Sequence, residues 1–148
     1  MPDTEPLVLF RRVPSGLNRR AIEAFARELS NRVAGGQQFH CLITEDARLQ
    51  QLNRRFLGKN YPTDVLSFPA GPGADGLGEL AISAQRAREQ AGEFGHTLEE
   101  EIRILMLHGV LHLTGMDHER DRGAMMRAER AWRKKFGLPA GLIERVSA

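Results

Sequence analysis

The chain has 148 residues, of which 41% are hydrophobic and 27% are charged, and its 21 Lys and Arg residues outnumber its 19 Asp and Glu residues to give a formal net charge of +2. This composition is typical of a single globular domain over residues 1–148 and excludes an intrinsically disordered chain. No apolar run approaches the roughly 18 residues needed to cross a bilayer, and the acidic N-terminus is unlike a signal peptide, so we expect a cytoplasmic protein with no membrane partner.

Two strands and a helix are predicted in the first 44 residues. The apolar run at 7–10 predicts a strand, and Asn18 can cap a helix that the glycines at 35–36 terminate. Residues 39–44 predict a second strand, in which the single cysteine, Cys41, is interpreted as a small buried hydrophobe. The apolar positions that recur at helical spacing in the first helix are Ile22, Phe25, Ala26 and Leu29.

A second helix and two further strands follow. Thr44 or Asp46 can cap the helix, which we expect to end at Gly58. After a break at 62–64, strands are predicted at 65–68 and 80–82, separated by a Gly/Pro loop at 71–76. The residues expected on the buried face of the helix are Leu49, Leu52 and Phe56.

Three helices are predicted in the remainder of the chain. Ser83 can cap a helix that runs through Ala91, and Thr97 with Glu100 forms a capping box before a longer helix that ends near 114–115. A last helix is predicted over 119–136. The expected inward-facing residues are Leu98, Ile102, Leu105, Met106 and Val110 in the longer helix, and Met125, Met126, Ala128, Trp132 and Phe136 in the last one. Strands with interleaved helices followed by helices predict an α+β domain.

Three of the five histidines fall within residues 108–118. His108 and His112 are four positions apart in a predicted helix, so their side chains project from one face, a turn apart. Gly115 can adopt the positive φ that ends the helix and returns His118 as a third ligand. The pattern predicts a metal site at the end of this helix, and the alternative is a set of unrelated helix histidines. The other two histidines, His40 and His96, have no ligand-like spacing and are assigned no role.

Three imidazole ligands favour zinc with one open coordination position. Water at that position has its pKa lowered to about 7, which is typical of a catalytic site and makes the metal-bound water the expected reactive group. Nickel, copper or iron would also accept imidazole ligands, so the pattern indicates a divalent transition metal and favours zinc among them.

The histidine spacing also matches the metzincin protease signature His-Glu-x-x-His-x-x-Gly-x-x-His, except at Gly109. In those proteases the Glu at this position is the general base. A zinc peptidase or amidohydrolase would therefore need a base from elsewhere, whereas metal chemistry on a phosphodiester stays available. Asp117 and Glu119 flank His118, and Asp117 is a candidate to accept a proton or to orient a ligand ring, unless it is only a helix cap.

The stretch from His108 to His118 is similar to the His-Gly-x-Leu-His-Leu-x-Gly-Tyr-Asp-His motif of the bacterial YbeY family of metal-dependent endoribonucleases. Residues 62–69, Pro-Thr-Asp-Val-Leu-Ser-Phe-Pro, resemble a second family segment, and 77–83, Leu-Gly-Glu-Leu-Ala-Ile-Ser, a third. Order and spacing agree over most of the chain.

The resemblance implies a small mixed four-stranded sheet packed against about five helices, and one zinc ion held by His108, His112 and His118. It implies hydrolysis of single-stranded RNA in the maturation of the 3′ end of small-subunit ribosomal RNA and in ribosome quality control. The ribosome, ribosomal proteins and a ribosome-associated GTPase are the partners that it implies.

Residues 1–60 carry ten Lys and Arg against six Asp and Glu, a basic half that precedes the histidine stretch. Arg54, Arg55 and Lys59 lie between Leu52–Asn53 and the family segment 62–69 and are the candidate RNA-binding residues, because phosphate contacts draw mainly on Lys and Arg. The alternative is an exposed, solvated helix face.

Three positions depart from the family pattern. Leu57 stands where the family usually has an Arg thought to help bind or cleave RNA, Met116 replaces a Tyr, and Glu79 replaces an Asp. Leu57 lends weight to a third hypothesis beside nuclease and peptidase, a non-enzymatic ribosome assembly factor in which zinc only stabilises the helix junction.

Overall fold

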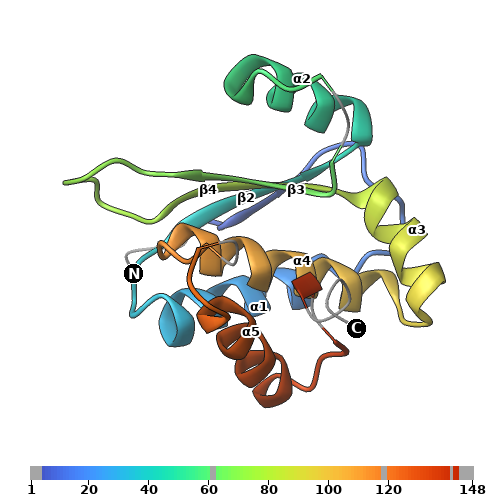
Figure 1. Ribbon diagram of the computed structural model, residues 1–148. Coiled ribbons are helices and arrows are strands. Elements are labelled where there is room, and N and C mark those ends of the chain that lie inside the picture. The colour runs from blue at the N-terminus through green and yellow to red at the C-terminus, as the bar shows by residue number, and fades with distance from the viewer. Residues whose placement is uncertain (1–4, 61–62, 118–119, 141, 144–148) are drawn as a thin grey trace.

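A four-stranded mixed sheet lies at the centre of the computed structural model, which describes residues 5–60, 63–117, 120–140 and 142–143 (Figure 1). The strand order is β1-β2-β4-β3; the first three of these run parallel and β3 is antiparallel to β4 at the edge. The strands are β1 (Val8–Phe10), β2 (Phe39–Thr44), β3 (Val65–Pro69) and β4 (Gly78–Ser83). The α+β class and the small mixed sheet are thereby confirmed. Cys41 is buried in β2 as predicted, and burial raises the pKa of its thiol.

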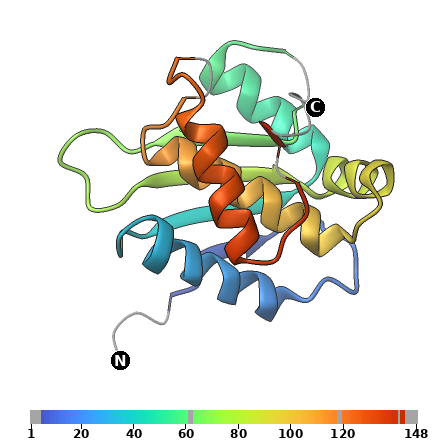
Figure 2. The same ribbon diagram turned by 60° about the horizontal axis from the view of Figure 1, so that its bottom comes forward.

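Helices cover both faces of the sheet. They are α1 (Arg19–Glu28), extended by a π-helical turn (Leu29–Val33), α2 (Asp46–Leu57), α3 (Ala84–Phe94), α4 (Leu98–Leu113) and α5 (Ala124–Lys135). Helices α1, α4 and α5 lie on one face and α2 on the other, with α3 at one end (Figure 1). Figure 2 shows α5 crossing α4 on the side away from the sheet. Within the described residues, no helix is both long and apolar enough to cross a membrane.

Three predicted helix caps are confirmed. The Asn18 side chain accepts a hydrogen bond from the Ala21 N–H at 3.0 Å, and the Ser83 hydroxyl accepts one from the Arg86 N–H at 3.1 Å. Thr97 and Glu100 form the complete capping box. These caps are local hydrogen bonds between residues three apart, which is why the sequence alone predicts them.

The predicted caps of α2 are wrong. The N-cap is Glu45, which makes no side-chain capping bond, and neither Thr44 nor Asp46 takes that position. The Gln85 side chain, on α3, instead accepts a hydrogen bond from the Asp46 N–H at 2.7 Å. A partner 39 positions along the chain satisfies the first turn, so local spacing could not reveal it.

The predicted start of α5 is also wrong, because the helix begins at Ala124 rather than at residue 119. The Asp121 carboxylate accepts hydrogen bonds from the N–H groups of Gly123 and Met125, and Gly123 has φ 87°. This turn delays the helix, while residues 118–119 lie outside the described part of the chain. Helix α3 extends three residues beyond its predicted end, to Phe94.

Helix α4 is the centre of the hydrophobic core. Eleven of its sixteen residues are buried, whereas the sequence predicted one inward stripe. The sheet lies on one side of α4, and α1, α3 and α5 pack against its other sides, so residues such as Ile104 and Leu107 are buried as well. One cluster of buried side chains runs from Leu7 to Ile143 through this helix.

Helix α2 is held by a smaller apolar cluster. Leu49 is buried against Leu66 and Ala81, and Leu52 packs against them in part. Phe56, which we predicted on the buried face, is 57% exposed. The cluster lies beneath the earlier turns of α2, and at the last turn the Phe56 ring meets the Phe68 ring at 70°, with 5.8 Å between centroids.

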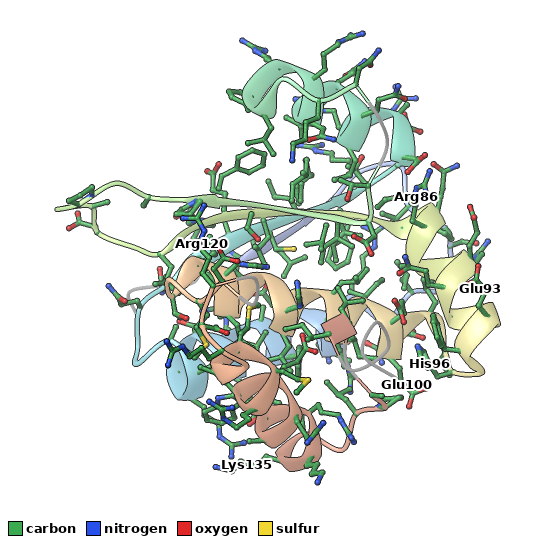
Figure 3. The ribbon with its side chains drawn as sticks, viewed as in Figure 1. Arg86, Glu93, His96, Glu100, Arg120 and Lys135 are labelled. Atoms are coloured by element: carbon green, nitrogen blue, oxygen red, sulfur yellow. The ribbon has the colours of Figure 1, made fainter. Side chains whose placement is uncertain are left out.

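A buried histidine–carboxylate pair stabilises the turn between α3 and α4, near the labelled His96 and Glu100 in Figure 3. The His96 Nε2 lies 2.6 Å from an oxygen of Glu101, whose side chain is fully buried. His96, which had no predicted role, therefore anchors the beginning of the central helix.

Gly109 sits where α4 and β4 approach most closely. A Cβ atom at this position would lie 2.7 Å from a methyl carbon of Leu80, which is itself buried in β4. On the same turn, the Ser67 hydroxyl of β3 donates a 3.4 Å hydrogen bond to the Gly109 carbonyl. Glycine at 109 therefore lets the helix lie close to the sheet.

We predict that Gly109→Ala lowers the free energy of unfolding by about 1–3 kcal/mol, because the added methyl group overpacks the core. The matched control is Gly92→Ala in α3, where an added Cβ meets nothing within 4 Å. That change should raise stability by up to about 1 kcal/mol through helix propensity. Urea unfolding of both variants checks the prediction, and equal effects would contradict it.

Candidate functional site

A cleft of about 660 Å³ lies between the C-terminal end of α4, strand β3 and the segment after α2. We call it the histidine cleft. It joins residues of 62–69 and 108–118, the two long motifs of the sequence. Its lining residues are Leu57, Lys59, Thr63, Asp64, Val65, Leu66, Ser67, Pro69, His108, His112, Gly115, Met116, Asp117 and Leu142.

His108 and His112 meet in this cleft as their spacing predicted. Their Nε2 atoms are 3.1 Å apart and their ring centroids are 4.7 Å apart. His108 is 8% exposed, and His112 is partly buried.

The Nδ1 atom of His108 bonds to a fully buried carboxylate. Glu129 of α5 places one oxygen 2.7 Å from this nitrogen, and its other oxygen accepts a 3.0 Å hydrogen bond from the Ile143 N–H. A carboxylate only accepts hydrogen bonds, so Nδ1 carries a proton, and in the neutral imidazole Nε2 is then the acceptor nitrogen.

The His112 ring is oriented by the backbone. Its Nδ1 donates a 3.0 Å hydrogen bond to the Met116 carbonyl. The turn that returns this carbonyl to the ring depends on Gly115, whose φ of 103° is unfavourable for other residues. Because a carbonyl only accepts, the Nε2 of His112 is also an acceptor. The predicted helix end at Thr114–Gly115 is thereby confirmed.

Two acceptor nitrogens thus face each other across 3.1 Å. In these tautomers one cation can accept both lone pairs at once. Zn–N bonds of about 2.0–2.1 Å at a tetrahedral angle place two nitrogens about 3.3 Å apart, so the observed separation fits such an ion. The donor set suits zinc or another imidazole-binding transition metal.

The third predicted ligand, His118, lies outside the described residues. Among the residues that are described, no three His, Cys, Asp or Glu side chains gather closely enough to hold a metal ion. The described part of the site is therefore the pair His108–His112 and its supports.

The other predicted site residues divide between two places. Asp117 lines the histidine cleft, half-exposed, with its carboxylate 3.8 Å from the Arg120 guanidinium. Lys59 also lines the cleft, whereas Arg55 lines a separate pocket between α2 and the sheet. Arg54 is exposed and is not among the described residues that line either one.

Three residues of the site were not predicted. Glu129 occupies the buried stripe of α5 between Met125 and Trp132, and a charged residue on that stripe was the available signal. Asp64 and Ser67 were quoted only as parts of a family motif. Asp64 accepts hydrogen bonds from the Val65 N–H at 2.7 Å and from the Gln90 side chain at 3.1 Å, which fix its carboxylate at the cleft.

The direction of position 109 bears on the peptidase alternative. Its Cβ would point at Leu80 in the core rather than toward the histidine pair. Metzincin-like chemistry requires a glutamate at this position to reach the metal. A larger side chain at 109 therefore requires Leu80 to move.

Comparison with known proteins identifies close relatives. The family model described as Endoribonuclease YbeY matches residues 14–137. A Solibacter usitatus protein named Endoribonuclease YbeY is 63% identical over 141 residues, which are 95% of this chain and 95% of the relative. A protein of the same name from Koribacter versatilis is 43% identical over 141 residues, covering 95% of this chain and 92% of the relative.

A solved structure is also similar. The solution structure of TM1509 from Thermotoga maritima superposes with a TM-score of 0.56 at 25% identity, covering 84% of this chain and 86% of that one.

We predict that Glu129→Ala destabilises the protein by roughly 2 kcal/mol or more, because it leaves two buried N–H donors without their acceptor. Lys134→Ala, an exposed change in the same helix, should stay within about 0.5 kcal/mol. Thermal and urea unfolding measure the difference. A Glu129→Ala variant as stable as Lys134→Ala would show that the buried carboxylate contributes nothing to the fold.

Proposed function

The chain belongs to the YbeY family of endoribonucleases, and from this premise we propose that it is a zinc-dependent endoribonuclease that hydrolyses phosphodiester bonds of single-stranded RNA in the histidine cleft. The observation that carries the proposal is the convergence of the two acceptor Nε2 atoms of His108 and His112 in that cleft.

We propose one zinc ion per chain, held by His108, His112 and His118. The tautomers that Glu129 and the Met116 carbonyl impose support this assignment, because both rings then present Nε2 to the ion. Another divalent transition metal would satisfy the same nitrogens. When bound, the ion supplies Lewis-acid chemistry: it withdraws charge from a phosphoryl oxygen and makes water more acidic.

The residues of the chain supply the remaining functions. Lys59 offers a cation for a phosphate in the cleft, and Ser67 offers a hydroxyl whose hydrogen bond to the Gly109 carbonyl is long at 3.4 Å. Asp117 remains our candidate to accept the proton from the attacking group. Asp64 is already bonded to the Val65 N–H and to Gln90, so it is better placed to shape the cleft.

Two routes of attack fit this arrangement. Either water or the ribose 2′-hydroxyl attacks the phosphorus, and the products differ. Internal attack gives a 2′,3′-cyclic phosphate, which analysis of product ends under single-turnover conditions detects.

The biological setting follows from the family resemblance. We propose that the substrate is ribosomal RNA, that the reaction matures the 3′ end of small-subunit RNA and serves ribosome quality control, and that the partners are the ribosome, ribosomal proteins and a ribosome-associated GTPase. We further propose that the chain acts in the cytoplasm as one domain, which its continuous core from Leu7 to Ile143 supports.

We predict that His112→Ala loses both stoichiometric zinc and RNA cleavage. His40→Ala should keep both, because His40 is exposed on β2 and lines no part of the histidine cleft. Metal analysis of the purified proteins and cleavage of a defined single-stranded RNA are the measurements.

Full cleavage by His112→Ala in the presence of chelator would refute metal-dependent catalysis. If the variant still supports normal ribosomal RNA maturation in cells, the assembly-factor hypothesis gains and the nuclease proposal fails.

Leu57 generates a second prediction. It is 47% exposed and lines the cleft at the position where the family usually has an Arg. We expect Leu57→Arg to raise the cleavage rate several-fold, because it adds a phosphate-binding cation beside the histidine pair. Phe94→Arg adds the same charge at a residue that is 50% exposed on α3, away from the cleft, and should leave the rate unchanged. An equal response of the two variants would mean that only net charge matters.

A further inference from the structure

We propose that the pocket between α2 and the sheet binds a nucleobase of the RNA strand whose backbone enters the histidine cleft, an inference that rests on the proposed function. This α2 pocket has a volume of about 440 Å³. It lies between α2 and the sheet, and its lining includes Arg48, Leu52, Arg55, Phe56, Phe68 and Glu79.

The α2 pocket and the histidine cleft are neighbours on two elements. At the end of α2, Phe56 lines the pocket and Leu57 lines the cleft. On β3, Phe68 lines the pocket, while Ser67 and Pro69 on either side of it line the cleft. Successive side chains of a strand point to opposite faces, so the edge strand β3 separates two adjacent sites. A nucleic-acid strand that passes this edge reaches both.

The aromatic surface of the pocket suits an unpaired base. Phe56 is 57% exposed, its ring meets the Phe68 ring at 70°, and the Arg55 guanidinium lies 5.4 Å from its centroid. The guanidinium lies over a face of this exposed ring, and proteins stack single-stranded bases both on aromatic rings and on Arg guanidinium planes. This assigns Arg55 to the base rather than to the scissile phosphate.

The charges around the pocket favour a phosphate backbone beside it. Arg48 lies on the same side of α2 as Arg55, and it also lines a neighbouring hollow with Arg11 and Arg12. These four cations oppose the two carboxylates of Glu45 and Glu79 in the two hollows, so the surface complements a phosphate backbone. An apolar protein segment would leave these arginines without counter-charges.

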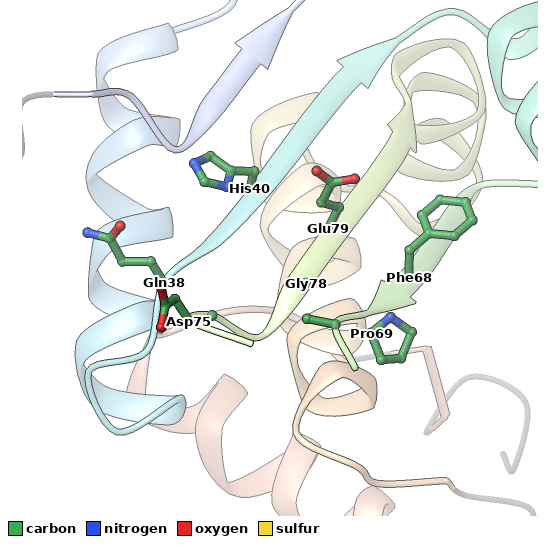
Figure 4. Close-up of a pocket in the computed structure, with 9 residues that line it drawn as sticks. Gln38, His40, Phe68, Pro69, Asp75, Gly78 and Glu79 are labelled. Atoms are coloured by element: carbon green, nitrogen blue, oxygen red, sulfur yellow. The ribbon is translucent and has the colours of Figure 1, made fainter. Parts of the chain in front are cut away.

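Glu79 adds an exposed carboxylate to the lining of the pocket. It is paired with Phe68 in the β3–β4 register, and Figure 4 shows both side chains on the same side of the sheet. A carboxylate repels phosphate but accepts hydrogen bonds from exocyclic amino groups, which adenine, cytosine and guanine carry and uracil lacks. The pocket therefore takes a base, with its amino edge toward Glu79.

The test is binding of labelled oligoadenylate and oligouridylate of about eight nucleotides by fluorescence anisotropy in chelator, which removes cleavage. Phe56→Ala should weaken oligoadenylate binding roughly five- to hundredfold, and Phe56→Trp should restore it. Phe94→Ala, which removes a similarly exposed ring from α3, should have no effect. Arg48→Ala should reduce the slope of log Kd against log salt by about 0.7.

Base selection gives an independent readout. Wild type should bind oligoadenylate more tightly than oligouridylate, and Glu79→Gln should narrow that preference, because an amide can donate to uracil as well as accept from adenine. An unchanged preference would overturn the role of Glu79.

The outcomes separate this inference from the proposed function. If wild type cleaves RNA and Phe56→Ala binds both oligonucleotides normally, the α2 pocket is not a base site and the nuclease proposal stands. If Phe56→Ala loses binding although wild type cleaves no RNA, the pocket stands and the nuclease proposal fails. If Phe56→Ala binds both oligonucleotides normally but no longer binds ribosomal proteins, the pocket is a protein interface and the base-site proposal is overturned.

Discussion

Helix α4 approaches the sheet so closely at Gly109 that a side chain there would collide with Leu80. The position of His108 and His112 follows from this contact, because both belong to the same helical turns and emerge where α4 passes the edge strand β3. A well-packed helix cannot shift by a methyl group without cost. The core thereby fixes the histidine pair, and the residue that permits the packing is the glycine that stands where a metzincin-like protease has its glutamate.

A buried histidine–carboxylate pair lies near each end of α4. His96 with Glu101 joins its first turns to the preceding loop, and His108 with Glu129 joins its last turns to α5. A buried carboxylate is costly unless its oxygens are hydrogen-bonded, and Glu129 meets this condition through His108 and the Ile143 N–H. The hydrogen bond between Glu129 and His108 therefore has two effects. It holds α5 against α4, and it fixes which nitrogen of His108 carries a proton.

Features set by residues close in sequence could be predicted, and features set by distant partners could not. The spacing of His108 and His112 predicted that the two side chains share a helix face. The caps at Asn18, Ser83 and Thr97 were predicted because each bonds to a residue three positions along the chain. Gln85 reaches the start of α2 from another helix, and Glu129 reaches His108 across 21 positions. Apolar periodicity predicted Phe56 on a buried face of α2. Its side chain is 57% exposed because the apolar cluster lies beneath the earlier turns of the helix, which the sequence does not show.

The basic character of the first 60 residues is distributed in a way that their net charge conceals. Of those cations only Lys59 lines the histidine cleft, whose other described ionisable groups are Asp64, Asp117 and the two histidines. Arg11, Arg12, Arg48 and Arg55 lie instead along the hollows on the α2 side of the sheet. The electrostatic attraction between these arginines and a polyanion falls off within about 8–10 Å at physiological salt. The arginines therefore attract only the part of a polyanion that lies against these hollows. On our proposal, a cleft whose described residues include a single lysine and no arginine uses that neighbouring surface to hold a long RNA strand.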